Sequence, residues 1–137
     1  MLIIDEFTYL YNSNPAYDSG LQFEGICEAY LKERFYEGKM PFFAEILGRW
    51  WGSNPVLKRQ EKIDIVALDD DNALFCKCKY TAGKFDEKEL KDLEDSALCI
   101  SRPNKHFMIF AKNGVSTGVK KKIEGNASFA VITLGDL

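Results

Sequence analysis

Ile63-Asp64-Ile65-Val66-Ala67-Leu68, an acidic turn, and Leu74-Phe75-Cys76-Lys77-Cys78-Lys79-Tyr80 form the stretch of this chain that decides its fold. The first run has apolar residues on both faces, which is typical of a strand in a sheet that is covered on two sides. The connecting residues, Asp69-Asp70-Asp71-Asn72, favour a tight turn. The sequence therefore predicts an antiparallel hairpin, with one strand over residues 62–68 and its partner over residues 74–80.

The segments around this hairpin alternate between helical and extended patterns. Residues 2–11 have apolar residues at helical spacing, and a stronger helix starts near Leu21 and stops at Gly38. Its apolar stripe consists of Phe23, Ile26, Cys27, Tyr30, Leu31 and Phe35. Further strands are predicted within residues 41–51, 107–111 and 129–134, and further helices open at Asp86 and Ser116. The core order helix-strand-strand-strand-helix-strand-helix-strand predicts an α/β domain.

Length and composition indicate one domain. The 137 residues suffice for a single core; we expect an N-terminal extension over residues 1–20 and the core over residues 21–137. No apolar run is long enough for a membrane helix, the N-terminus does not have the pattern of a signal peptide, and the cysteine spacing does not favour zinc. We therefore expect a cytoplasmic protein that does not insert into membranes.

The net charge of −3 allows nucleic-acid binding only through a local basic surface. Three groups of basic residues are candidates: Lys58, Arg59 and Lys62; Lys77, Lys79 and Lys84; and Lys120, Lys121 and Lys122. Each group could equally be an ordinary solvated face.

The two strands of the hairpin carry the residues with chemical potential. Metal-dependent phosphodiester hydrolysis needs carboxylates that hold Mg²⁺ and benefits from a cation near the phosphorus. Asp64 can supply one carboxylate, and Lys79 can supply the cation. The position two residues before Lys79, on the same face of the strand, holds Lys77. Its ammonium group cannot bind a metal and would attract Asp64 into an ion pair, so a purely structural charge cluster is an equally open interpretation.

Together with the flanking residues, the hairpin resembles a known family. The residues of the resemblance are Phe23-Glu24-x-Ile26-Cys27, Leu47-Gly48-Arg49-Trp50-Trp51-Gly52, Ile63-Asp64-Ile65-Val66-Ala67-Leu68, Cys78-Lys79-Tyr80 and Phe110-Ala111-Lys112-Asn113-Gly114. They are similar to the domain of unknown function at the C-terminus of archaeal-type and bacterial DEXX-box ATPases, a branch of the PD-(D/E)XK nuclease-like superfamily. The resemblance covers residues 21–137.

This resemblance implies a restriction-endonuclease-like fold, in which helices flank a mixed central sheet. It implies catalytic roles for Glu24, Asp64 and Lys79, with Mg²⁺ as the cofactor of an active enzyme and Asp64 as its ligand. Lys77 stands where the family has a metal-binding glutamate, and Lys62 stands where many members have another acid. The chain has no phosphate-binding loop of its own, so the ATPase module would lie elsewhere in a longer chain or in a separate subunit.

Three functions remain open at this stage. The first is a nuclease-like domain that binds DNA with its cleavage lost or weakened, through candidate contacts at Arg49, Arg59, Lys62 and Lys84. The second is an interaction or regulatory module of an ATPase, in which the fold serves as a scaffold. The third is an active Mg²⁺-dependent nuclease with a relocated carboxylate, for which Glu24 and Glu61 are candidate sources.

Overall fold

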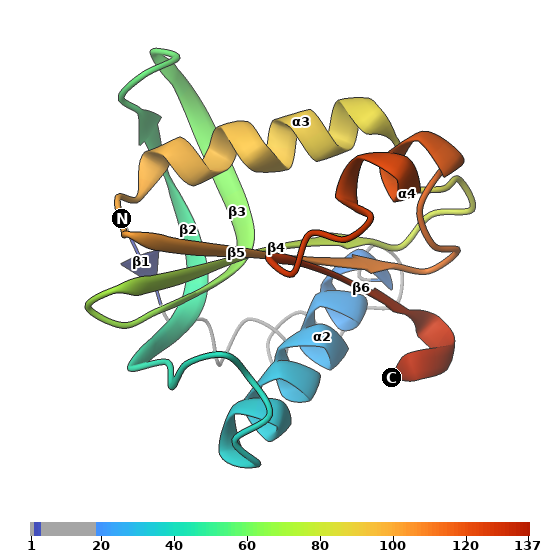
Figure 1. Cartoon of the computed structure of the whole chain (residues 1–137), viewed down its shortest axis with the longest axis horizontal. Helices are drawn as coiled ribbons and strands as arrows, with labels where there is room; N and C mark the ends of the chain where they lie inside the picture. The colour runs from blue at the N-terminus through green and yellow to red at the C-terminus, as the bar shows by residue number, and fades with distance from the viewer. Residues whose placement is uncertain (1, 4–18) are drawn as a thin grey trace.

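A computed structural model describes residues 2–3 and 19–137 (Figure 1). The described helices are α2 (Ser19–Tyr36), α3 (Glu87–Ser96) and α4 (Thr117–Ile123), with short 3-10 turns at Ala97–Cys99 and Leu134–Asp136. The described strands are β1 (Leu2–Ile3), β2 (Ile46–Asn54), β3 (Arg59–Leu68), β4 (Asn72–Lys79), β5 (Asn104–Ala111) and β6 (Phe129–Thr133). They form one mixed sheet, which confirms the α/β class.

The sheet follows the chain from edge to edge, in the order β1-β2-β3-β4-β5-β6. Strands β1 to β4 are antiparallel neighbours, whereas β4, β5 and β6 are parallel. Parallel neighbours need a crossover, and α3 and α4 supply the two crossovers. Both helices cover one face of the sheet, and α2 covers the other (Figure 1). The predicted hairpin is confirmed, with Val66 opposite Phe75 and Leu68 opposite Ala73.

Local signals in the sequence fix the ends of the helices. The Asp86 side chain accepts a hydrogen bond from the Glu89 N–H, and the Glu89 side chain accepts one from the Asp86 N–H, which completes a capping box for α3. The Ser116 side chain caps α4 in the same way, through the N–H of Val119. Gly38, just past α2, has a φ of 71°, a backbone conformation that glycine adopts without strain. The expected helix boundaries are confirmed at these three points.

Two apolar clusters occupy the two faces of the sheet. The cluster under α3 and α4 includes Trp50, Ile63, Val66, Phe75, Phe85, Leu90, Ile109 and Val119. The cluster under α2 includes Phe23, Cys27, Leu31, Ile65, Ala67, Leu74, Cys76 and Phe110. The strand β3 contributes to both, which confirms the expected two-sided coverage. The adjacent tryptophans lie in different environments, with Trp50 in the core and Trp51 about half exposed.

Three expectations about local structure were wrong in detail. Ile26 was expected in the buried stripe of α2 but is 50% exposed, whereas Glu24 and Glu28 of the same helix are buried. Strand β2 continues past the predicted end at Trp51, because its pairing with β3 extends through Gly52 to Asn54. Leu2–Ile3 forms a strand beside β2, not a helix, and the rest of the helix expected over residues 2–11 lies outside the described residues.

The turn between β2 and β3 depends on one buried amide, and its loss should destabilise the protein. The Asn54 side chain accepts hydrogen bonds from Val56 N–H and Leu57 N–H, each at 3.0 Å, and donates one at 2.9 Å to the Asp95 carbonyl at the end of α3. In Asn54→Ala, we expect the free energy of unfolding to fall by about 2 kcal/mol, because buried backbone groups lose their partners. Urea unfolding measures this loss. Ser53→Ala, at an exposed position, is the matched control, and an equal loss there would contradict the role of Asn54.

Candidate functional site

A break in the sheet positions Asp64. Gly48 lies opposite Val66 and Trp50 lies opposite Ile63, so two residues of β3 (Asp64 and Ile65) face the single residue Arg49. This β-bulge bends β3 and changes the face to which the following side chains point. The pairing of β3 with β4 also ends here, because Ile65 opposite Cys76 is the last pair on this side. Asp64 therefore lies where β3 and β4 separate.

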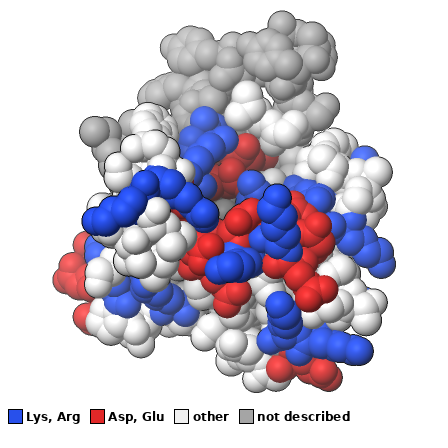
Figure 2. Space-filling model, turned by 90° about the horizontal axis from the view of Figure 1, so that it is seen from above, with Lys and Arg blue, Asp and Glu red and all other residues white. Residues whose placement is uncertain are grey.

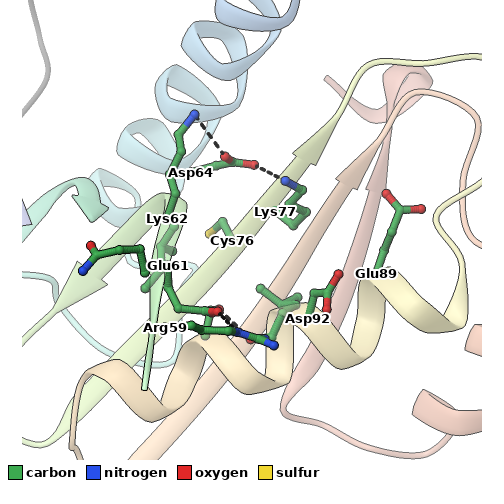
Figure 3. Close-up of a pocket in the computed structure, with 12 residues that line it drawn as sticks. Arg59, Glu61, Lys62, Asp64, Cys76, Lys77, Glu89 and Asp92 are labelled. Atoms are coloured by element: carbon green, nitrogen blue, oxygen red, sulfur yellow. Dashed lines mark hydrogen bonds and ion pairs between the residues drawn. The ribbon is translucent and has the colours of Figure 1, made fainter. Parts of the chain in front are cut away.

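The Asp64 carboxylate bridges this separation. Its Oδ2 atom accepts a hydrogen bond from the Cys78 N–H at 2.9 Å and lies 3.4 Å from Lys77 Nζ. Its Oδ1 atom lies 4.0 Å from Lys62 Nζ. Figure 3 shows the carboxylate between the two lysine side chains. A buried carboxylate is stable only when it is paired and hydrogen-bonded, and Asp64 meets both conditions.

Glu24 brings a second acidic group to this position from the opposite face of the sheet. Its side chain is buried, and Oε1 accepts no hydrogen bond from the part of the chain that the structure describes. Burial, and then the negative charge of Asp64, raise the pKa of Glu24 to about 7, against a smaller lowering by Lys62, Arg49 and Lys77. The carboxyl groups of Glu24 and Asp64, the two acids to which the resemblance gives catalytic roles, therefore interact. With a pKa of about 7, Glu24 is half protonated near neutral pH.

Asp64 lies at one end of a cleft of about 430 Å³ between β3, β4 and α3 (Figure 3). Seven charged residues line it: Arg59, Glu61, Lys62, Asp64, Lys77, Glu89 and Asp92. Seen from the side of α3, acidic groups gather at the centre of the face, with basic groups around and between them (Figure 2).

In three ion pairs of this cleft, Lys62–Asp64, Lys77–Asp64 and Arg59–Glu61, the acid is buried and the base is exposed. The side chain of Asp64 is 6% exposed, while those of its partners Lys62 and Lys77 are 56% and 44% exposed. Arg59, 48% exposed, pairs in the same way with Glu61, which is 10% exposed. An incoming molecule that reaches Asp64 therefore meets Lys62 and Lys77 before the carboxylate. On the α3 wall of the cleft it meets the acids Glu89, which is 25% exposed, and Asp92, which is exposed.

The other residues predicted for the site have different positions. Lys79 forms a 2.6 Å ion pair with Glu89 of α3. Arg49 lies opposite the bulge and acts electrostatically on Glu24. Lys84 lines a different cavity, between α4 and β6. The structure thus brings together Glu24, Arg49, Lys62, Asp64 and Lys77, with Arg59 on the wall of the cleft and Lys84 outside it.

This arrangement does not fit the Mg²⁺ ion that the resemblance implies. Two ammonium groups occupy the surroundings of the Asp64 carboxylate, where further oxygen ligands of a Mg²⁺ ion would have to lie. Within residues 2–3 and 19–137, no three side chains of the ligating types gather into a metal-binding group. No step of the chemistry is therefore assigned to a metal here.

The sequence alone did not lead us to Glu89 and Asp92, which form the α3 wall of the cleft. For Glu89, the capping pattern Asp86-x-x-Glu89 was a usable signal, because it fixes the Glu89 side chain at the first turn of α3. The ammonium group of Lys79 pairs with Glu89 there. For Asp92 we find no local signal, since its position depends on how α3 packs over the sheet.

Comparison with known proteins gives a family and no closer relative. A family model described as archaeal and bacterial proteins of unknown function matches residues 7–93, more than half of the chain. No curated protein and no solved structure matches. Among the described helices, none combines the length and apolar character needed to cross a membrane.

Proposed function

The chain belongs to DUF234, a family of archaeal and bacterial proteins of unknown function, and we propose that it is a nuclease-like domain that binds nucleic acid without cleaving it. The proposal includes a restriction-endonuclease-like fold and an ATPase partner, in the same full-length chain or as a separate subunit. Both follow from the resemblance of the motifs around Asp64. The remaining argument rests on the cleft itself.

One observation carries the proposal: the basic member of each ion pair around Asp64 is the exposed member. A phosphodiester backbone that approaches the cleft can take Lys62 and Lys77 as counterions. Their attraction to the buried Asp64 keeps both side chains near one point, so less side-chain entropy is lost on binding. Arg59, anchored by Glu61 and Asp95, extends the basic surface along β3. Such contacts recognise phosphate and carry no base specificity.

The same geometry is unfavourable for cleavage. Hydrolysis with Mg²⁺ needs several oxygen ligands on the metal, and here the position of the second carboxylate is held by Lys77. Lys79, the cation expected near the phosphorus, is instead paired with Glu89. The proximity of Glu24 to Asp64 is the one feature that favours the alternative, an active nuclease with a relocated ligand.

Nucleic-acid binding should be salt-dependent and should require the two lysines. We expect Lys62→Ala/Lys77→Ala to weaken binding of a labelled DNA duplex about tenfold at low salt. We also expect the slope of log K against log salt to fall by about 0.9 for each phosphate contact that is removed. Fluorescence anisotropy between 25 and 200 mM salt would measure both effects, with single-stranded DNA and RNA as further probes.

Lys39→Ala/Lys88→Ala, which removes the same charge at other exposed positions, is the matched control and should leave DNA affinity unchanged. Binding that is equal in wild type and in Lys62→Ala/Lys77→Ala would contradict the assignment of the cleft, and no binding at 25 mM salt would contradict nucleic-acid binding altogether. Mg²⁺-dependent cleavage that disappears in Asp64→Ala would support the active nuclease instead.

A further inference from the structure

A second cavity, separate from the Asp64 cleft, lies between α4 and β6. It has a volume of about 600 Å³, within the usual range for a ligand site. Val115, Ile123 and Val131 provide apolar lining; Val115 is buried, and the other two are half-buried. Neither the nuclease-like motifs nor the proposed DNA contacts account for an apolar groove at this edge of the sheet.

The rim of this groove is basic. Lys84, from the segment before α3, lies at the groove together with Lys120 and Lys121 of α4. Glu124 is the single carboxylate among the residues that line the groove. All three lysines are exposed, and none forms an ion pair with the rest of the described chain. Lys122, their neighbour, instead pairs with Glu87 at 3.6 Å. The groove therefore offers uncompensated positive charge next to an apolar floor.

The groove also reaches the edge of the sheet at β6, beside which no other described strand lies. In the parallel pairing of β5 with β6, Phe107 lies opposite Phe129, and its N–H donates to the Ser128 carbonyl. The backbone N–H and C=O groups of the odd-numbered residues of β6 therefore point away from β5. Two of these have local partners: Phe129 N–H donates to Asn126, and Thr133 N–H donates to the Asp136 side chain. Val131, in the middle, is left as the position where a partner backbone can pair, directly beside the apolar floor.

We propose that this groove is a docking site for a short, acidic, extended segment of a partner protein. One apolar side chain of the segment lies over Val115, Ile123 and Val131. Its backbone pairs with Val131 at the edge of β6, in the manner of strand addition. Carboxylates on either side of the apolar residue pair with Lys84, Lys120 and Lys121.

A peptide fits this site better than a nucleic acid does. A phosphodiester backbone could use the three lysines, and its oxygens could accept a hydrogen bond from the Val131 N–H, but it has no group that fits the apolar floor. An acidic peptide uses all three features at once. The local capping at Phe129 and Thr133 limits backbone pairing to about one residue, so the lysines must supply much of the specificity.

The test uses a defined probe: a fluorescein-labelled heptapeptide with a central leucine and two aspartates at each end. Fluorescence anisotropy measures its affinity for the full chain. We expect Lys84→Ala/Lys120→Ala/Lys121→Ala to weaken binding about tenfold, because three exposed ion pairs are removed. Lys39→Ala/Lys88→Ala/Lys91→Ala removes equal charge from other exposed positions and should leave the affinity within twofold. A peptide with serine in place of leucine should bind at least about tenfold more weakly.

A second readout does not depend on any variant. Peptide added to the unsubstituted protein should shift the amide resonance of Val131 and slow its hydrogen exchange. Equal loss of peptide affinity in the two triple variants, or an unchanged Val131 amide on saturation, would overturn the proposal. DNA binding lost only in the groove variant, with no peptide binding, would assign the groove to nucleic acid instead. The proposal is independent of the Asp64 cleft, since Lys62→Ala/Lys77→Ala should bind the peptide normally.

Discussion

Lys77→Glu should convert the Asp64 cleft into a binding site for divalent cations, with an affinity for Mn²⁺ about 100-fold above that of the unsubstituted protein. The change removes an ammonium group 3.4 Å from Asp64 Oδ2 and places a carboxylate on the same face of β4. A unit charge about 4 Å away contributes about 4 kcal/mol at an effective dielectric of about 20. Partial exposure of the Lys77 side chain weakens this interaction through solvent screening. The expected 100-fold effect corresponds to about 2.7 kcal/mol, which is a moderate fraction of the energy for a complete change from a positive to a negative charge.

Isothermal titration calorimetry with Mn²⁺ and Mg²⁺ would measure the affinity, and a rise in melting temperature with metal concentration would confirm it. Two controls separate the contributions. Lys77→Met removes the ammonium group without adding a ligand, and Lys88→Glu adds an acid on the exposed side of α3; neither should bind metal. Within Lys77→Glu, a further Glu24→Gln change should weaken binding, because the second carboxyl group comes from α2. No heat of binding in Lys77→Glu would mean that residue 77 does not face Asp64 as described.

The hairpin and the order of the core elements followed from local patterns. Runs of apolar residues, the acidic turn at residues 69–72 and the capping residues Asp86 and Ser116 each act over a few residues. The structure confirms them for this reason. The spacing of two between Lys77 and Lys79 correctly placed both on one face of β4, because alternation is a property of the strand itself.

The details of the site depended on contacts between distant segments. The bulge at Asp64 arises from a shift in the register with which β2 pairs with β3, and no pattern within β3 alone indicates it. Periodicity placed Ile26 in the apolar stripe, but the packing of α2 on the sheet exposes Ile26 and buries Glu24. Lys79 was expected beside Asp64, and the approach of α3 instead gives it Glu89 as a partner. In each case the sequence supplied the residue type, and tertiary packing determined its neighbour.

Glu24→Gln should remove a pH dependence of stability that the unsubstituted protein shows between about pH 4.5 and 7. Burial and the nearby Asp64 charge raise the pKa of Glu24 from 4.5 to about 7 in the folded state. Between these values the unfolded chain has lost the proton and the folded chain has kept it, so stability falls as pH rises through this range. The loss from this one group is on the order of 3 kcal/mol, and it is complete above about pH 7. Glutamine does not titrate, so its unfolding free energy should lack this contribution.

Urea unfolding of both proteins at pH 4.5, 5.5, 6.5 and 7.5 tests this, because the difference between them isolates Glu24 from every other titrating group. We expect the free energy of unfolding of Glu24→Gln to rise steadily, relative to that of the unsubstituted protein, as the pH increases across this range. A constant offset from the new amide would not change this trend. Asp64→Asn keeps an acceptor for the Cys78 N–H but removes the charge, so it should reduce the slope due to Glu24 only in part, since burial is the larger cause of the raised pKa. A difference between Glu24→Gln and the unsubstituted protein that stays constant from pH 4.5 to 7.5 would mean that the pKa of Glu24 is the same in the folded and unfolded chains, so that Glu24 is ionised at neutral pH. The surroundings of Asp64 would then carry more negative charge at neutral pH, which would weaken the case for a phosphate backbone beside Lys62 and Lys77.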